Sequence, residues 1–288
     1  MIHGNVTATF GPLALIGALL VGSLLSADPA PAQSDTLSDT RAREGRGEDE
    51  IVLIHGLGAD ASVWDDVIPY LRGTLKVWTY ELHGHGQTQP LSNPSITAEA
   101  EALGAYLKEH DLPYPTLVGH GMGGLIALRF AFDHPVDVER LILIDAAPRQ
   151  LATDEEKQHI AVSLVEDYER FIAARYLNYS PNPEISERIV DMALRTDSVS
   201  FVSLLMSSFD FDMTAELSKQ SVPILVIGSE MLFPGDASER AMLDHIGFGS
   251  ARTIAFKKIP LAGHYIMLER PVYLASVILA YAKYGEYR

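Results

Sequence analysis

The chain of 288 residues contains no cysteine. This absence excludes disulfide bonds, metal sites built from thiolates and lipid attachment at a cysteine side chain. It also makes a reducing and an oxidising compartment equally compatible with the chain, because no thiol is present to respond to either.

Basic residues are in the minority. The chain has 22 Lys and Arg against 38 Asp and Glu, a formal net charge of −16, with no long block of like charge. An anionic protein repels polyanions, so nucleic acid and anionic membrane surfaces are disfavoured as partners. Hydrophobic residues make up 47% of the chain, enough for a substantial core, and the length fits one α/β domain with an insertion.

The N-terminal segment differs from the rest of the chain. Residues 10–25 form a mostly apolar run without charge, and a small-residue pattern, Ala-Pro-Ala, ends at Ala32. This order is typical of a secretory signal peptide. It predicts a signal peptide over residues 1–32, export after cleavage near Ala32, and a polar linker over residues 33–50. An uncleaved N-terminal anchor is the alternative, and both place the domain outside the cytoplasm. We expect no other contact with a membrane.

Short apolar runs alternate with stretches of helical periodicity from residue 51 onward. The predicted strands are 51–54, 76–82, 116–118, 140–145, 223–229 and 252–259, and the predicted helices are 61–71, 96–112, 122–134, 236–246 and 271–284. This alternation predicts an α/β fold, a mostly parallel sheet flanked by helices, with ligands bound beyond the carboxyl ends of the strands. We expect the core to comprise residues 51–148 and 220–288.

The alternation stops over residues 149–219, where only helices are predicted, at 155–177, 183–195 and 198–209. This segment carries many large apolar residues: Tyr168, Phe171, Tyr176, Phe201, Leu204, Leu205, Met206, Phe209 and Phe211. So many apolar groups are not expected in a solvent-exposed loop, because their burial contributes much of the stability of a fold. The segment is therefore predicted to be a helical cap over the strand ends.

A glycine-rich turn, Gly-His-Gly-Met-Gly-Gly over residues 119–124, joins a predicted strand to a predicted helix. Such a junction is typical of two kinds of site. In a nucleophile elbow, G-x-S-x-G, it holds a serine above the sheet, and Gly121 stands at the serine position. In a dinucleotide fingerprint, G-x-G-x-x-G, it binds a pyrophosphate, and Asp145 follows about 20 residues on. That fingerprint normally lies in the first strand–helix–strand unit, whereas two units precede this turn, so we expect no cofactor.

Three further motifs occur in order along the chain. Residues 55–58 read His-Gly-Leu-Gly after the first strand, residues 84–86 read Gly-His-Gly after the second, and residues 263–264 read Gly-His after the last. Together with the turn at 119–124, they resemble the α/β-hydrolase family, in its branch of small esterases and lactonases with a helical cap. The resemblance covers residues 51–288 and implies a site built for an ester-type carbonyl.

The resemblance assigns roles to single residues. His264 is the expected base and then acid of the reaction, and position 121 is that of the attacking group. The acid that orients His264 is expected after the strand at 224–227, where Glu230 is the first choice and Asp236 the second.

The oxyanion hole is expected from two segments. The backbone amides of Leu57 and Met122 would hold the developing negative charge on the carbonyl oxygen. The loop that presents Leu57 also contains His55, Gly56 and Gly58.

Gly121 itself carries no hydroxyl, thiol or carboxylate, so no covalent intermediate can form there. Three hypotheses stay open. The chain is a hydrolase whose serine was lost by natural or deliberate replacement, with serine-type turnover lost or very weak. It is a non-catalytic ligand-binding relative of hydrolases. Or His264 and Glu230 carry out acid–base chemistry on a carbonyl without a protein nucleophile.

The apolar cap predicts a small, uncharged, hydrophobic carbonyl compound as the ligand. His85 and His120 flank turns, and we expect them to be packed and hydrogen-bonded. His83 and His85 alternate, but no further ligand follows at a spacing typical of zinc, so no metal is expected. The oligomeric state stays open.

Overall fold

The computed structural model describes residues 49–149, 152–233, 235 and 238–286. The predicted signal peptide and all of the predicted linker except its last two residues lie outside these ranges and stay predictions. Asp49 and Glu50, which we predicted as linker, are instead the first residues of strand β1. Among the helices of the described ranges, none combines the length and the apolar character that a membrane span requires.

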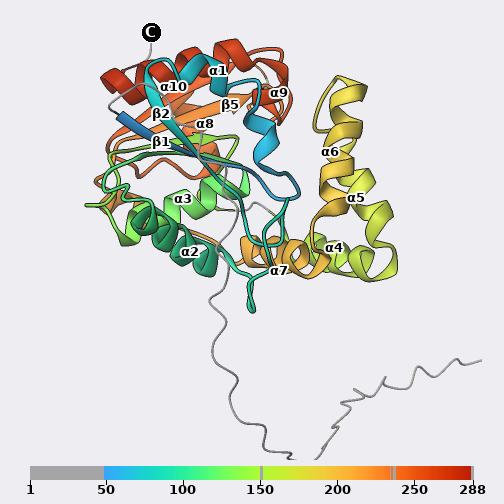
Figure 1. The fold of residues 1–288 in the computed structure, drawn as a ribbon. Helices are drawn as coiled ribbons and strands as arrows, with labels where there is room; N and C mark the ends of the chain where they lie inside the picture. Colours follow the sequence, from blue (N-terminus) through green and yellow to red (C-terminus); the bar gives the residue numbers. More distant parts are fainter. Residues whose placement is uncertain (1–48, 150–151, 234, 236–237, 287–288) are drawn as a thin grey trace, which may run out of the picture. The chain divides into compact units, whose positions relative to one another are not determined.

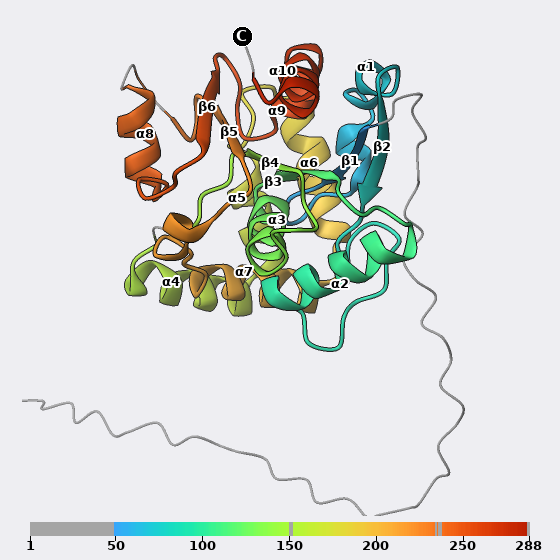
Figure 2. The same ribbon diagram turned by 90° about the vertical axis from the view of Figure 1, so that its left-hand side faces the viewer.

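The centre of the fold is a six-stranded sheet with the order β2-β1-β3-β4-β5-β6 (Figure 1 and Figure 2). The strands are β1 (Asp49–Ile54), β2 (Leu75–Tyr80), β3 (Thr116–His120), β4 (Arg140–Ile144), β5 (Ile224–Ser229) and β6 (Ile254–Ile259). Every pairing between neighbouring strands is parallel. The predicted mostly parallel sheet is therefore confirmed. Every residue of β3 and β5 is buried, which explains why central strands read as continuous apolar runs.

Helices cover both faces of the sheet. The core helices are α1 (Ile68–Leu71), α2 (Ile96–Glu109), α3 (Met122–Asp133), α8 (Glu239–Ile246), α9 (Ile266–Glu269) and α10 (Pro271–Tyr284), with short 3-10 helices η1 (Ala61–Trp64) and η2 (Glu216–Lys219). α1 and α10 pack together on one face, and α2 and α3 pack together on the other (Figure 1). α3 also packs on β3 and β4, and this contact fixes the turn between β3 and α3.

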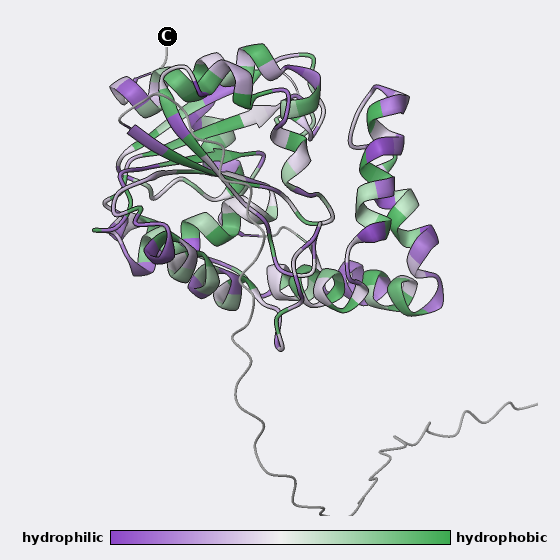
Figure 3. Cartoon of the chain, viewed as in Figure 1, coloured by the Kyte–Doolittle hydropathy of each residue, from purple (hydrophilic) through white to green (hydrophobic). Residues whose placement is uncertain are grey.

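Four helices lie between β4 and η2, in the segment predicted to be the cap and called the cap below: α4 (Asp154–Glu166), α5 (Tyr168–Tyr176), α6 (Pro183–Arg195) and α7 (Ser198–Phe209). The single helix predicted over 155–177 is wrong, because Asp167 leaves helical geometry and its side chain caps α5. Polar and apolar residues occur together along α5 and α6 (Figure 3), and the buried ones include Ile172, Tyr176, Ile189 and Met192. The cap is thus packed on apolar side chains.

The turn between β3 and α3 is closely packed. A Cβ atom at Gly119 would lie 2.5 Å from the Gly124 backbone nitrogen, and one at Gly124 would lie 2.5 Å from the Ala146 Cβ. A Cβ at Gly123 would contact the carbonyl oxygens of His55 and Ile54. The glycines therefore allow α3 to approach β1, β3 and the chain after β4.

We expect the Gly119→Ala substitution to lower the free energy of unfolding by about 3 kcal/mol, because the added methyl group meets backbone atoms that no side-chain rotation can move. Gly73→Ala is the matched control, since no atom lies within 4 Å of a Cβ at Gly73. Urea unfolding of both variants measures the difference. Equal midpoints would contradict the packing described for this turn.

Candidate active site

A cavity of about 280 Å³ lies at the carboxyl ends of the strands, with walls from both the sheet and the cap. The core contributes Leu57, Gly121, Met122, Asp145 and His264, among others, and the cap contributes residues that include Arg175, Tyr176 and Tyr179. Ligands are expected at this edge of a parallel sheet, and the volume suits a small molecule.

Gly121 forms the tip of the turn between β3 and α3. Its φ of 50° and ψ of −114° lie in a region that side chains rarely adopt. The Gly121 amide donates a hydrogen bond of 2.9 Å to the Ile144 carbonyl, which ties the tip to β4. A Cβ at this position would lie 3.4 Å from His264 Nε2 and 3.6 Å from its Cε1. The imidazole of His264 therefore faces position 121, as the sequence predicted.

His264 is held at both its backbone and its ring. Its backbone amide donates to the Tyr179 carbonyl of the cap at 2.8 Å. Its Nδ1 lies 3.1 Å from Oδ2 of Asp145. An ionised carboxylate only accepts hydrogen bonds, so Nδ1 carries the proton and the Nε2 lone pair faces position 121. This is the arrangement by which a carboxylate orients a histidine base.

Asp145 follows the last residue of β4 and has a φ of 45°, a strained backbone conformation that aspartate tolerates better than most side chains. Its fully buried carboxylate accepts a hydrogen bond of 2.6 Å from the Ser229 amide and another from the Ser229 hydroxyl. Ser229 is the last residue of β5. The acid thus connects the ends of two neighbouring strands to His264.

The prediction that Glu230 is the acid that orients His264 is wrong. Its exposed carboxylate accepts hydrogen bonds from Lys258 Nζ at 3.2 Å and from the Leu261 amide at 3.1 Å. Together, the Leu261 amide and the Lys258 charge hold the pKa of Glu230 below its ordinary value. The second choice, Asp236, lies outside the described residues.

Asp145 was visible in the sequence at the end of the predicted strand 140–145, but it matched the dinucleotide pattern. The ends of β4 and β5 are adjacent, since Ile144 pairs with Ile227. The sequence therefore places an acid near the same histidine at the end of either strand, and no local pattern tells which of the two contacts it.

The predicted oxyanion loop approaches the elbow closely. A Cβ at Gly56 would lie 2.8 Å from His120 Nδ1, and one at Gly58 would lie 2.6 Å from the Tyr176 hydroxyl. That hydroxyl donates a hydrogen bond of 2.7 Å to the Leu57 carbonyl. Within the described part of the chain, the backbone amides of Leu57 and Met122 donate to no protein acceptor. Both residues line the cavity, as an oxyanion hole requires.

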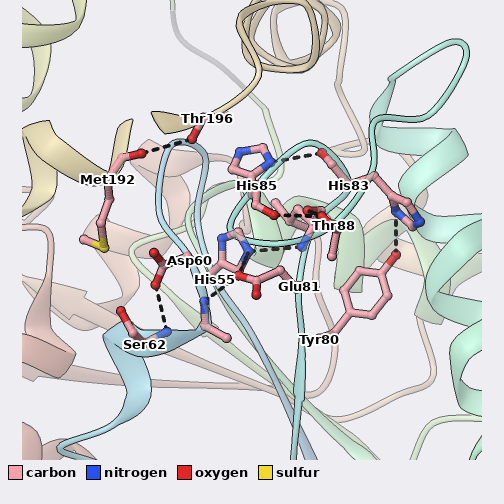
Figure 4. Close-up of polar contacts among 12 residues, drawn as sticks. His55, Asp60, Ser62, Tyr80, Glu81, His83, His85, Thr88, Met192 and Thr196 are labelled. Atoms are coloured by element: carbon pink, nitrogen blue, oxygen red, sulfur yellow. Dashed lines mark hydrogen bonds and ion pairs between the residues drawn. The ribbon is translucent and has the colours of Figure 1, made fainter. Parts of the chain in front are cut away.

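The histidines of the turns are buried and neutral. His55 lies beside His85 and Glu81 (Figure 4). Its Nε2 accepts from the Leu82 amide at 3.0 Å, so its Nδ1 donates to the Gly56 carbonyl at 2.8 Å. Burial lowers the pKa of His55 to about 4 and the pKa of His85 to about 3.

His120 is likewise buried, and burial holds its pKa well below the ordinary value. Its Nε2 lies 3.0 Å from the His264 carbonyl oxygen, which only accepts, so Nε2 donates this hydrogen bond and the ring supports the histidine loop. The described residues contain no group of three His, Asp or Glu side chains that could hold a metal ion.

The comparison with known proteins agrees with this geometry. A model of the alpha/beta hydrolase family matches residues 51–277. The chain belongs to this family. Its parallel sheet flanked by helices is the fold of this family.

Individual relatives differ in how much of the chain they match. An uncharacterized protein of Mycobacterium tuberculosis is 33% identical over 150 residues, which cover 52% of this chain but only 43% of that protein. The pimeloyl-(acyl-carrier protein) methyl ester esterase of Pectobacterium carotovorum is 25% identical over 257 residues, 83% of this chain and 96% of the esterase. The structure of the enol-lactonase from Burkholderia xenovorans has a TM-score of 0.73 at 22% identity and covers 84% of this chain and 95% of that one.

We expect this hydrolase fold to lose stability in acid, because of its buried neutral histidines. Below pH ~6.5 the unfolded chain binds protons at His55 and His85, whereas the folded chain does not until about pH 4 and about pH 3. Each histidine therefore lowers the free energy of unfolding by about 1.4 kcal/mol per pH unit across its window.

The measurement is urea unfolding between pH 7 and pH 5. His85→Gln should give a shallower decline than the unmodified chain, because one titrating group is removed. The same exchange at His245, which is exposed on α8, is the control. If the free energy of unfolding declined with the same slope in the His85 and His245 variants, the buried histidine would not be the origin of the acid sensitivity.

Proposed function

We propose that the chain binds small esters or lactones in a hydrolase-type site and that Gly121 occupies the position of the nucleophile. The observation that supports this most strongly is the 3.4 Å between a Cβ at position 121 and His264 Nε2. A serine hydroxyl carried on that carbon would lie within hydrogen-bonding reach of the imidazole. The names of the esterase and the lactonase above also favour an ester or lactone carbonyl.

In the serine form of this site, the hydroxyl oxygen at position 121 attacks the carbonyl carbon while His264 Nε2 takes its proton. Asp145 stabilises the resulting imidazolium, and the amides of Leu57 and Met122 hold the oxyanion. The imidazolium then gives the proton to the leaving alkoxide. Water repeats the sequence on the acyl group and restores the serine.

With glycine at position 121, the chain retains the base, the acid and the oxyanion amides but has no protein nucleophile. Its remaining route is direct attack by a water whose proton passes to His264 Nε2 and then to the leaving oxygen. This route lacks the covalent step, so turnover by the unmodified chain is very weak. Ligand binding does not depend on the missing hydroxyl.

A second candidate function is ligand binding without catalysis. The observation in its favour is Gly121 itself, because glycine adopts the strained elbow geometry without the penalty that a serine meets there. In a protein that only binds its ligand, replacement of serine by glycine at position 121 raises the stability of the fold. The loss of catalytic activity has no effect on its function.

We expect Gly121→Ser to raise kcat for chromogenic esters by on the order of 10⁴- to 10⁶-fold over the unmodified chain. The substitution should also lower the free energy of unfolding by about 1–3 kcal/mol, because serine must adopt a positive φ. Ester hydrolysis and urea unfolding measure the two effects. Gly121→Ala is the control, since it introduces the same strain without the hydroxyl. Equal inactivity of both variants would support the binder.

The identity of the acid is tested in the Gly121→Ser background. Asp145→Asn should lower kcat by on the order of 10⁴-fold, because an amide no longer stabilises the imidazolium or fixes its tautomer. Glu230→Gln should leave kcat unchanged, since that carboxylate is bonded to Lys258 and Leu261. If Glu230→Gln lowered kcat and Asp145→Asn did not, Glu230 would be the acid, as the sequence predicted.

A further inference from the structure

Arg175 projects from the cap helix α5 into the wall of the active-site cavity. It is the only Lys or Arg among the described residues that line this cavity. Its half-buried side chain shares the cavity wall with Tyr176, Tyr179 and Tyr265, and its guanidinium stands 5.9 Å from the centre of the Tyr179 ring. A single cationic side chain therefore faces a cavity whose wall combines apolar side chains with tyrosine hydroxyls and the polar groups of the site.

The guanidinium of Arg175 has no carboxylate within ion-pair distance in the described part of the chain, although Glu155 and Glu156 line a second hollow that Arg175 also lines. No aspartate or glutamate forms an ion pair with it there, and its buried Nε has no hydrogen-bond acceptor. Asp145, the acid that also lines the cavity, already accepts from Ser229 and His264. A buried cation without a counter-ion is costly, so an anionic ligand in the cavity gains free energy from the guanidinium that lines it.

Arg175 also lines a hollow beside α4, which contains Glu155 and Glu156. The Glu156 carboxylate caps its own helix through Thr153. The side chain of Arg175 thus stands between the outer surface of the cap and the cavity. It belongs to the part of the cavity wall that the cap provides, whereas the elbow belongs to the part that the sheet provides.

We propose that the ligand is a small ester or lactone that carries a carboxylate, which Arg175 binds while the carbonyl lies at the elbow. This inference rests on the proposed function for the position of the carbonyl and adds the class of the ligand. It replaces the uncharged ligand expected from the sequence, where Arg175 was one charge among many apolar cap residues.

The site favours a carboxylate over a phosphate. A planar guanidinium donates two parallel hydrogen bonds to a carboxylate. A phosphate monoester carries close to two negative charges, whereas this cavity offers a single arginine and the whole chain carries a net charge of −16. One singly charged group matches one guanidinium.

The test compares monomethyl adipate, which carries a carboxylate, with dimethyl adipate, which does not. Calorimetric titration of the unmodified chain should show tighter binding of the monoester. Arg175→Gln should weaken monoester binding by about 10- to 100-fold and leave diester binding unchanged. Arg170→Gln, an exposed position on the same helix, is the matched control and should change neither.

Arg175→Lys tests the same point if the glutamine variant does not fold. A lysine retains the charge without the planar fork, so it should keep a reduced preference for the monoester. Added salt should diminish that preference in the unmodified chain. Equal affinity for the two esters in the unmodified chain, or an equal loss for both in the Arg175 variants, would overturn the proposal.

Hydrolysis in the Gly121→Ser background separates this inference from the proposed function. If dimethyl adipate is hydrolysed in a manner that depends on His264 but Arg175 has no effect on the monoester, the carbonyl site stands and the carboxylate assignment fails. If binding depends on Arg175 but neither ester is hydrolysed, the ligand class stands and the hydrolase proposal fails.

Discussion

The hydrogen bonds of one buried carboxylate hold the site together. Asp145 accepts from the amide and the hydroxyl of Ser229 and from Nδ1 of His264. The neighbouring parallel strands β4 and β5 thereby position a histidine that lies more than a hundred residues further along the chain than Asp145. Because the carboxylate is fully buried, these bonds are not weakened by competition with water. The strained backbone at Asp145 is the cost of directing this carboxylate toward the loop.

The elbow imposes a second constraint, which is steric. Gly119, Gly123 and Gly124 let α3 approach the sheet so closely that added carbon atoms meet backbone. The approach places the first amide of α3 beside the oxyanion loop and turns position 121 toward the imidazole. None of this depends on which side chain stands at position 121. The geometry of the proposed site is therefore compatible with glycine at position 121, while the chemistry that we propose for it depends on that one residue.

The fold was predictable because its signals are local. Periodicity located the strands, and the motifs at residues 55–58, 119–124 and 263–264 located the elbow, the oxyanion loop and His264. The acid was not predictable, because Asp145 and Glu230 both follow strands that end near His264, and only the three-dimensional contacts separate them. Arg175 was missed for a similar reason: the role that we propose for it rests on the lack of an ion pair among the described residues, which no sequence pattern records.

The cap is joined to the site by two hydrogen bonds that its helix α5 and the following loop provide. The Tyr179 carbonyl accepts from the His264 amide, and the Tyr176 hydroxyl donates to the Leu57 carbonyl. Displacement of this part of the cap breaks both bonds and releases the histidine loop and the oxyanion loop together. An opening of the cavity at this part of the cap would therefore disturb His264 and the proposed oxyanion amides at the same time.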